Sequence, residues 1–89
     1  MASIISNATH ITSATTTNIT PAVIFSQVNI NTTGAGTITV NDGVAGTTIC
    51  VITTAASTPP VMLVYDVELK SGTLSVITSA TMDITILWE

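Results

Sequence analysis

Residues 61–70 read V-M-L-V-Y-D-V-E-L-K, and this stretch decides the fold class of the chain. Its odd positions are all apolar, whereas its even positions change from apolar at Met62 and Val64 to charged at Asp66, Glu68 and Lys70. Because side chains alternate between the two faces of a strand, this pattern predicts a β-strand. We expect the first half of the strand to be buried on both faces and the second half on one face only.

A second strand is predicted directly after the first. Residues 70–72, K-S-G, interrupt the alternation, and residues 73–78, T-L-S-V-I-T, resume it. Two such runs joined by a short turn that contains glycine are typical of a β-hairpin. We expect this hairpin, together with a last strand at residues 82–88, to form the half of the sheet onto which the other strands pack.

The remaining strands are separated by short turns with glycine, asparagine or proline. They are predicted at residues 22–31, 37–41 and 47–54, and residues 55–60 link the two halves of the sheet. In the first of them, Ile24, Val28 and Ile30 share one face, while Phe25 lies on the other. Short strands at this regular spacing predict an all-β fold: a small antiparallel β-sandwich, jelly-roll-like or Ig-like, of about six to eight strands.

The composition agrees with an all-β protein and excludes several functions. The chain has 19 threonines and 12 isoleucines, β-branched residues that suit a pleated surface. Only 7% of the residues are charged, the net charge is −4 and there is no arginine, which argues against nucleic-acid binding. No stretch approaches the ~18 apolar residues of a membrane span, and no signal peptide is recognisable. We therefore expect synthesis in a cytoplasm and no membrane partner.

The small size of the chain favours association with other chains. A domain of 89 residues buries about two-thirds of its unfolded surface and is marginal alone. A single cysteine, Cys50, excludes an internal disulfide, and a single histidine, His10, excludes a multi-histidine metal site. Oligomerisation or a larger partner is the remaining source of stability. The alternative is that the threonine-rich surface reflects β propensity alone.

Residues 1–20 differ from the rest of the chain and are predicted to be an N-terminal arm that precedes a single domain at residues 21–89. The arm is low in complexity, and its large apolar residues besides Met1 are Ile4, Ile5, Ile11 and Ile19. Ile11 indicates a short edge strand around residues 8–12. We expect the four isoleucines to form an interface on a neighbouring subunit; the alternative is a loose tail.

The sequence contains no recognisable catalytic constellation. Asp66 and Glu68 lie two apart on one strand face and, with Asp83, offer carboxylate ligands for calcium. Calcium needs six or more oxygens and Lys70 continues the same face, so a solvated polar surface is the preferred interpretation. His10 has no partner at catalytic spacing and Cys50 lies in mid-strand, which predicts a surface histidine and an inert thiol. We expect no enzymatic activity, no cofactor and no small-molecule substrate.

The order of strands and turns resembles a group of small phage virion proteins. The resemblance covers roughly residues 28–87 and is found in five segments: residues 28–36, V-N-I-N-T-T-G-A-G; 37–43, T-I-T-V-N-D-G; 47–52; 65–79, from Tyr65 to Ser79; and 83–86. The chain departs from the pattern at Ala80, where a glycine is common, and at Trp88-Glu89, where a basic or aromatic residue is common. The resemblance implies a capsid decoration (cement) protein or a tail-associated protein.

Two functions from different classes follow from these observations. The first is a virion structural protein, which we expect to be a homotrimeric cement protein that binds itself and the major capsid protein and stabilises a phage head. The alternative is a β-sandwich module of a tail or spike that binds carbohydrate or another virion protein. Phe25, Tyr65 and Trp88 are the only aromatic residues and fit inward positions, which weakens the carbohydrate interpretation.

Overall fold

The computed structural model describes residues 7–32, 34–56 and 60–89, which form eight β-strands. No helix in this part of the chain is long and apolar enough to cross a membrane. The strands are β1 (Asn7–Ile11), β2 (Thr16–Ile19), β3 (Ile24–Thr32), β4 (Gly36–Asp42), β5 (Thr47–Thr54), β6 (Val61–Glu68), β7 (Leu74–Thr78) and β8 (Asp83–Trp88).

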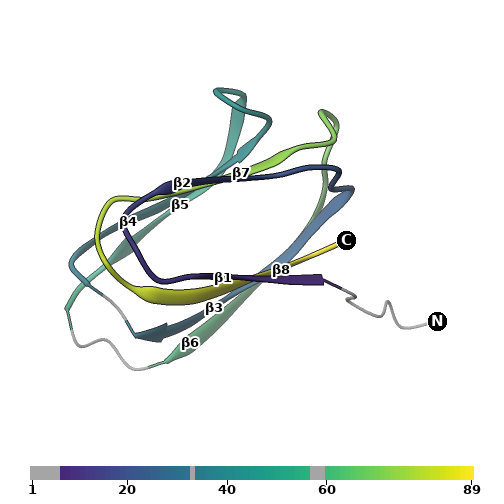
Figure 1. Ribbon diagram of the computed structural model, residues 1–89. Coiled ribbons are helices and arrows are strands. Elements are labelled where there is room, and N and C mark those ends of the chain that lie inside the picture. The colour runs from purple at the N-terminus through teal and green to yellow at the C-terminus, as the bar shows by residue number, and fades with distance from the viewer. Residues whose placement is uncertain (1–6, 33, 57–59) are drawn as a thin grey trace.

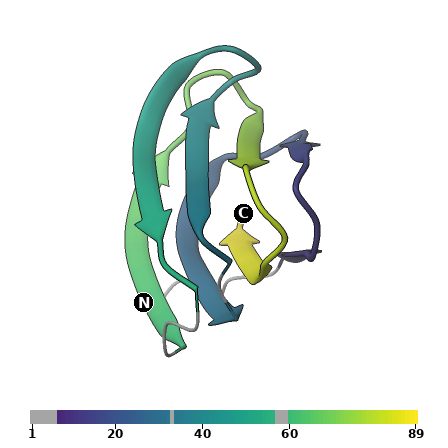
Figure 2. The same ribbon diagram turned by 90° about the vertical axis from the view of Figure 1, so that its left-hand side faces the viewer.

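The strands form two packed antiparallel sheets, so the predicted all-β sandwich is confirmed. One sheet has the order β1-β8-β3-β6 and the other β2-β7-β4-β5. Figure 1 shows the two layers almost edge-on. Figure 2, turned by 90°, shows β5 and β6 on one side of the sandwich and β1 and β2 on the other.

The order of the strands is that of a jelly roll. The pairs β1·β8, β2·β7, β3·β6 and β4·β5 are all antiparallel, as if one long ribbon with its tip at the β4–β5 turn had been rolled up. Rolling the ribbon then brings β3 beside β8 and β4 beside β7. Eight strands arranged in two sheets by this winding are the jelly-roll architecture. Of the two sandwich types that the sequence left open, the structure has the first.

Alternate apolar side chains of the central strands fill the space between the sheets. The β4 residues Ile38 and Val40 and the β8 residues Ile84 and Ile86 are fully buried, as their period of two predicts. Trp88 continues the inward face of β8 and packs against the core, and its indole N–H donates to the Thr9 hydroxyl over 2.9 Å. The last strand predicted at residues 82–88 is therefore confirmed as β8.

A β-bulge in β3 changes which of its side chains point inward. Phe25 is opposite Trp88 and Gln27 is opposite Leu87, so Ser26 is an extra residue relative to β8. The extra residue shifts the alternation, and Phe25 therefore joins Val28 in the core. The prediction that Phe25 and Val28 lie on opposite faces was wrong, because a bulge leaves no mark in the period-two pattern.

The hairpin predicted from residues 61–78 is not formed. The strands β6 and β7 exist, but β6 pairs with β3 in one sheet and β7 pairs with β2 and β4 in the other. Residues 70–72, K-S-G, belong to the connection in which the chain crosses from one sheet to the other. Local sequence indicates that a turn occurs, but which strand pairs with which depends on distant partners.

The strand β6 lies at an edge of its sheet, which corrects a second expectation. Its alternation is confirmed: Leu63 and Tyr65 pack against the core, whereas Asp66 is exposed. The first half, however, is not buried on both faces, since Val64 and Met62 are largely exposed. An edge strand has a neighbour on one side only, so apolar residues on its outer face stay in contact with water.

The region predicted to be an arm contributes two strands to the sandwich. The expected edge strand is present as β1, which pairs with β8, and β2 pairs with β7 in the other sheet. Residues 7–19 therefore lie at one edge of both layers instead of forming an extended arm. The inward side chains of Ile11 and Ile19 close this edge of the core.

Candidate functional site

The predicted interface residues divide into two groups. Ile11 and Ile19 are buried in the core of their own chain, so they are not available as an exposed contact surface. Their isolation among polar residues suggested an interface, whereas each is the last inward residue of a short edge strand. Ile4 and Ile5 lie outside the described residues.

The three acids considered as calcium ligands are not brought together. Asp83 is opposite Thr32 at one end of the β1-β8-β3-β6 sheet, while Glu68 is opposite Ile24 at the other end. Asp66 lies between them and accepts a hydrogen bond from the Ser26 hydroxyl over 3.0 Å. Among the described residues no three His, Cys, Asp or Glu side chains form a group suited to a metal ion.

Asp83 instead binds His10 across the β1–β8 pair. The Nε2 atom of His10 lies 2.5 Å from Oδ1 of Asp83, and the Asn31 side-chain amide donates to the same oxygen over 3.3 Å. The contact with His10, with a smaller contribution from Asn31, lowers the pKa of the Asp83 carboxyl. Both partners are exposed, so this is a surface contact that ties β1 to β8.

Cys50 and Tyr65 contact each other between the two sheets, on the side of the sandwich formed by the edge strands β5 and β6. Cys50 belongs to β5 and Tyr65 to β6, and both pack against the core. Burial raises the pKa of the Cys50 thiol, which outweighs the opposite effect of its hydrogen bond with Tyr65. The thiolate that nucleophilic chemistry requires is therefore disfavoured. The Tyr65 ring also stacks on Phe25, with 5.1 Å between centroids.

Asp42 is the last residue of β4, and its side chain organises the neighbouring connection between β6 and β7. Its carboxylate accepts hydrogen bonds from the backbone N–H groups of Lys70 and Ser71 and from the Ser71 hydroxyl, at 2.6–3.0 Å. The hydroxyl contact, followed by the two N–H groups, lowers the pKa of Asp42. This aspartate thus holds the crossover between β6 and β7 against the tip of the β4–β5 ribbon.

The Asp42 contacts predict a pH-dependent loss of stability. Because the folded state lowers the pKa, the contribution is fully present above an ordinary aspartate pKa of about 4 and disappears as the pH falls through the folded value. Asp42→Asn is expected to lower the melting temperature at pH 7, and the difference from the wild type should vanish in acid. Ser71→Ala should reproduce part of the effect. A difference that is constant from neutral pH to pH 2 would contradict this role.

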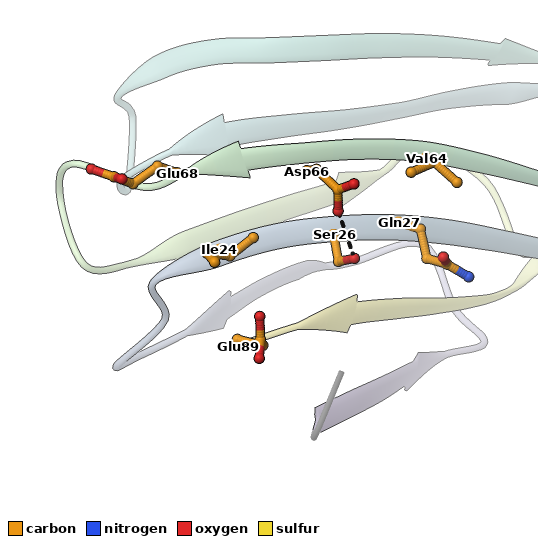
Figure 3. Close-up of a pocket in the computed structure, with 7 residues that line it drawn as sticks. All are labelled: Ile24, Ser26, Gln27, Val64, Asp66, Glu68 and Glu89. Atoms are coloured by element: carbon orange, nitrogen blue, oxygen red, sulfur yellow. Dashed lines mark hydrogen bonds between the residues drawn. The ribbon is translucent and has the colours of Figure 1, made fainter. Parts of the chain in front are cut away.

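A depression of about 550 Å³ lies on the outer face of the β1-β8-β3-β6 sheet. It lies over β3 and β6 beside the paired bulges, where Tyr65 and Asp66 together oppose Ser26. Figure 3 shows its lining side chains, which include two apolar residues, two neutral polar residues and three acids: Ile24, Val64, Ser26, Gln27, Asp66, Glu68 and Glu89. Asp66 has a positive φ of 51°, which carries its carboxylate toward Ser26. The surface is acidic and polar, with no aromatic ring in its lining.

Three of the exposed large apolar side chains among the described residues lie close together at the start of β6. Val61, Met62 and Val64 are 40%, 60% and 58% exposed. We call residues 61–64 the open half of β6. Beyond them the strand carries the bulge and the acids Asp66 and Glu68, which prevent close approach of another strand. This surface was not predicted, because the apolar run at residues 61–64 was expected to be buried on both faces.

Strand β5 forms the other edge on the same side of the sandwich. Its outer face is mostly threonine, and Val51 is its one largely exposed valine among the described residues. The β5 edge is therefore more polar than the open half of β6. The apolar side chains identify the open half of β6 as the better candidate for binding another chain.

Comparisons of this chain with protein-family models, with curated proteins and with solved structures gave no match.

Proposed function

We propose that this protein is a non-enzymatic structural component of a phage virion, a capsid decoration protein that binds copies of itself and the major capsid protein. The exposed apolar open half of β6 is the observation that carries the proposal. An edge strand presents a row of N–H and C=O groups that can pair with another chain. Proteins usually protect such edges with charge or bulges, and here only the second half of β6 is protected in this way.

The energetics of the chain favour association. Its core is small, with fourteen buried apolar residues among those described. Burial of the open half of β6 in an interface removes exposed apolar surface from water, which is worth roughly 25 cal/mol per Å². The low charge of the chain, 7% of residues, also weakens repulsion between copies. Each of these features suits a protein that is stable when packed against others.

The jelly-roll order is compatible with this role but does not assign it. Jelly rolls occur in viral capsid domains and in lectins, so the fold supports both functions expected from the sequence. The resemblance to small virion proteins favours the first. In such a protein, the β6 edge would join neighbouring copies, and the threonine-rich face of the other sheet remains available for the shell.

Binding to shells tests the proposal directly. Shells assembled from the major capsid protein of the same genome are mixed with purified protein and sedimented. We expect wild-type protein to cosediment at a fixed stoichiometry, and Val64→Lys to bind less, because a charge on the β6 edge prevents the contacts between neighbouring copies that support binding to the shell. Val23→Lys, at an equally exposed valine outside the β6 strand, is the matched control. Absence of wild-type protein from the pellet would overturn the proposal.

The acidic depression over β3 and β6 favours the second candidate, a module that binds carbohydrate. Its Gln27 and Asp66 side chains are of the kind that bind sugar hydroxyls. The aromatic rings weigh against it, since Phe25 is buried and Tyr65 and Trp88 pack against the core. Glycan-array binding that is lost in Gln27→Ala would favour this function over the virion role, and a blank array would remove its support.

A further inference from the structure

The open half of β6 combines a free backbone edge with exposed apolar side chains. On one side β6 pairs with β3, and no other described strand pairs with it. Met62 and Val64 are largely exposed on its outer face, whereas Leu63 points inward and packs against the core. The free edge is short, because the bulge at Tyr65 and Asp66 disrupts the ladder. A strand that pairs here therefore has residues 61–65 as partners.

A second copy of β6 matches this edge in both length and chemistry. Residues 61–65, V-M-L-V-Y, carry no charge and no proline, so two such segments meet without a buried charge or a missing N–H group. Each copy also brings the exposed side chains of Met62 and Val64, which the other copy can cover. The edge is therefore complementary to itself, as a contact about a twofold axis requires.

The alternation of side chains restricts how two β6 strands can be aligned. Residues opposite each other in an antiparallel pair share a face, so their numbers must add up to an even total. The register centred on Leu63 sets Met62 of each copy opposite Val64 of the other, and these exposed side chains then cover one another on the outer face. The register centred on Met62 would instead set Val64 opposite Pro60, which has no N–H to donate.

The acids of β6 favour the antiparallel direction. Asp66 and Glu68 follow the apolar half of the strand and are exposed. Parallel pairing would bring the acids of the two copies together, and like charges on neighbouring strands destabilise a sheet. The antiparallel register centred on Leu63 sets Asp66 of each copy near Pro60 of the other, so the two Asp66 residues are roughly 20 Å apart along the strands. This distance exceeds the Debye length of about 8 Å at physiological salt, so their repulsion is screened.

We propose that two copies of this chain pair their β6 strands antiparallel, about a twofold axis at Leu63. The two four-stranded sheets then form one continuous sheet across the dimer. This inference rests on the proposed self-association and specifies its geometry. Both copies use the same surface, so the contact is isologous and closes at a dimer. The homotrimer expected from the sequence would need a second, different contact.

Cysteine variants on the outer face of β6 report this register directly. Met62→Cys and Val64→Cys are each made in a Cys50→Ser background, so that the introduced residue is the only cysteine. Both positions are largely exposed, so neither substitution opens a cavity in the core. Circular dichroism establishes that each variant is folded. The variants are oxidised with diamide, alone and as an equimolar mixture, and disulfide-linked dimers are measured on non-reducing gels.

Val23→Cys in the same background, mixed with Met62→Cys, is the matched control. Val23 is as exposed as Met62, but its carbonyl oxygen accepts a hydrogen bond from the Leu69 N–H over 2.7 Å, beyond the opposite end of β6. The proposed dimer therefore does not bring Val23 of one copy to Met62 of the other. Any linking in this mixture measures random collisions between exposed thiols.

The mixture of Met62→Cys and Val64→Cys is expected to give at least about 10-fold more linked dimer than either variant alone or the control mixture. Opposed residues have Cα atoms about 4.5–5.5 Å apart, within the range of a disulfide. The two copies of one residue are diagonal neighbours at about 7–8 Å, which is too far without backbone movement.

Three results would contradict the proposal at different levels. Linking of Met62→Cys with itself as efficiently as in the mixture would overturn the register. Linking no higher than in the control mixture, for a wild type that light scattering shows to be oligomeric, would overturn the β6 pair and leave the proposed self-association standing. A wild type that keeps the 9.1 kDa mass of a single chain at every concentration would overturn both.

Discussion

Phe25→Ala is expected to lower the free energy of unfolding by about 3–5 kcal/mol. The ring is fully buried between the sheets and stacks on Tyr65, so its removal leaves a cavity at the centre of the core. A chain of this size has a total stability of roughly 4–13 kcal/mol, of which this loss is a large share. Urea unfolding followed by circular dichroism measures the change.

Val23→Ala is the matched control for this substitution. Val23 is two residues away but 60% exposed, and its truncation should change the stability by less than about 0.5 kcal/mol. If Phe25→Ala lowered the free energy of unfolding as little as Val23→Ala does, the Phe25 ring would not be a core residue. The bulge at Ser26 would then not turn this ring inward. The alternation would then run through β3 without a shift, as the sequence alone predicted.

Deletion of residues 2–20 is expected to abolish folding. It removes β1 and β2, and with them Ile11 and Ile19 from the core, each of which is worth about 2–5 kcal/mol by itself. It also exposes new edges on β8 and β7. Deletion of residues 2–6 removes none of the described strands and should leave the fold intact.

Circular dichroism and thermal melting of the two deletion variants distinguish the strand and arm interpretations. If residues 7–19 belong to the sandwich, only the longer deletion loses its cooperative transition. If the whole of residues 1–20 were an arm, both variants would melt close to the wild type. Ile19→Ala provides a milder test, with an expected loss within the same range of about 2–5 kcal/mol.

The sequence was sufficient to predict seven of the eight described strands because their signals are local, whereas β2 (Thr16–Ile19) was assigned to the arm. Alternation in β4 and β8 predicts Ile38, Val40, Ile84 and Ile86 as core residues, and all four are buried. The fold class follows from the same pattern. What alternation cannot supply is the pairing of strands, which is why the K-S-G segment was assigned to a hairpin although it crosses between sheets.

The errors at the candidate site have the same origin. Val64 is apolar and lies in an apolar run, but it is exposed because it lies on the outer face of β6, a strand at the edge of its sheet. Ile11 stands alone among polar residues, and only its pairing opposite Ile84 of β8 reveals a core residue. The bulge at Ser26 likewise depends on β6 and β8. Each of these features depends on contacts between residues distant in sequence.

The central claim is that copies of this chain associate through the β6 edge. Light scattering of wild type, Val64→Lys and Val23→Lys over a dilution series tests it most directly. We expect the wild type and Val23→Lys to form an oligomer that dissociates on dilution, and Val64→Lys to remain a folded monomer at every concentration. A wild type that is monomeric throughout, or a Val64→Lys protein that associates equally well, would contradict the claim.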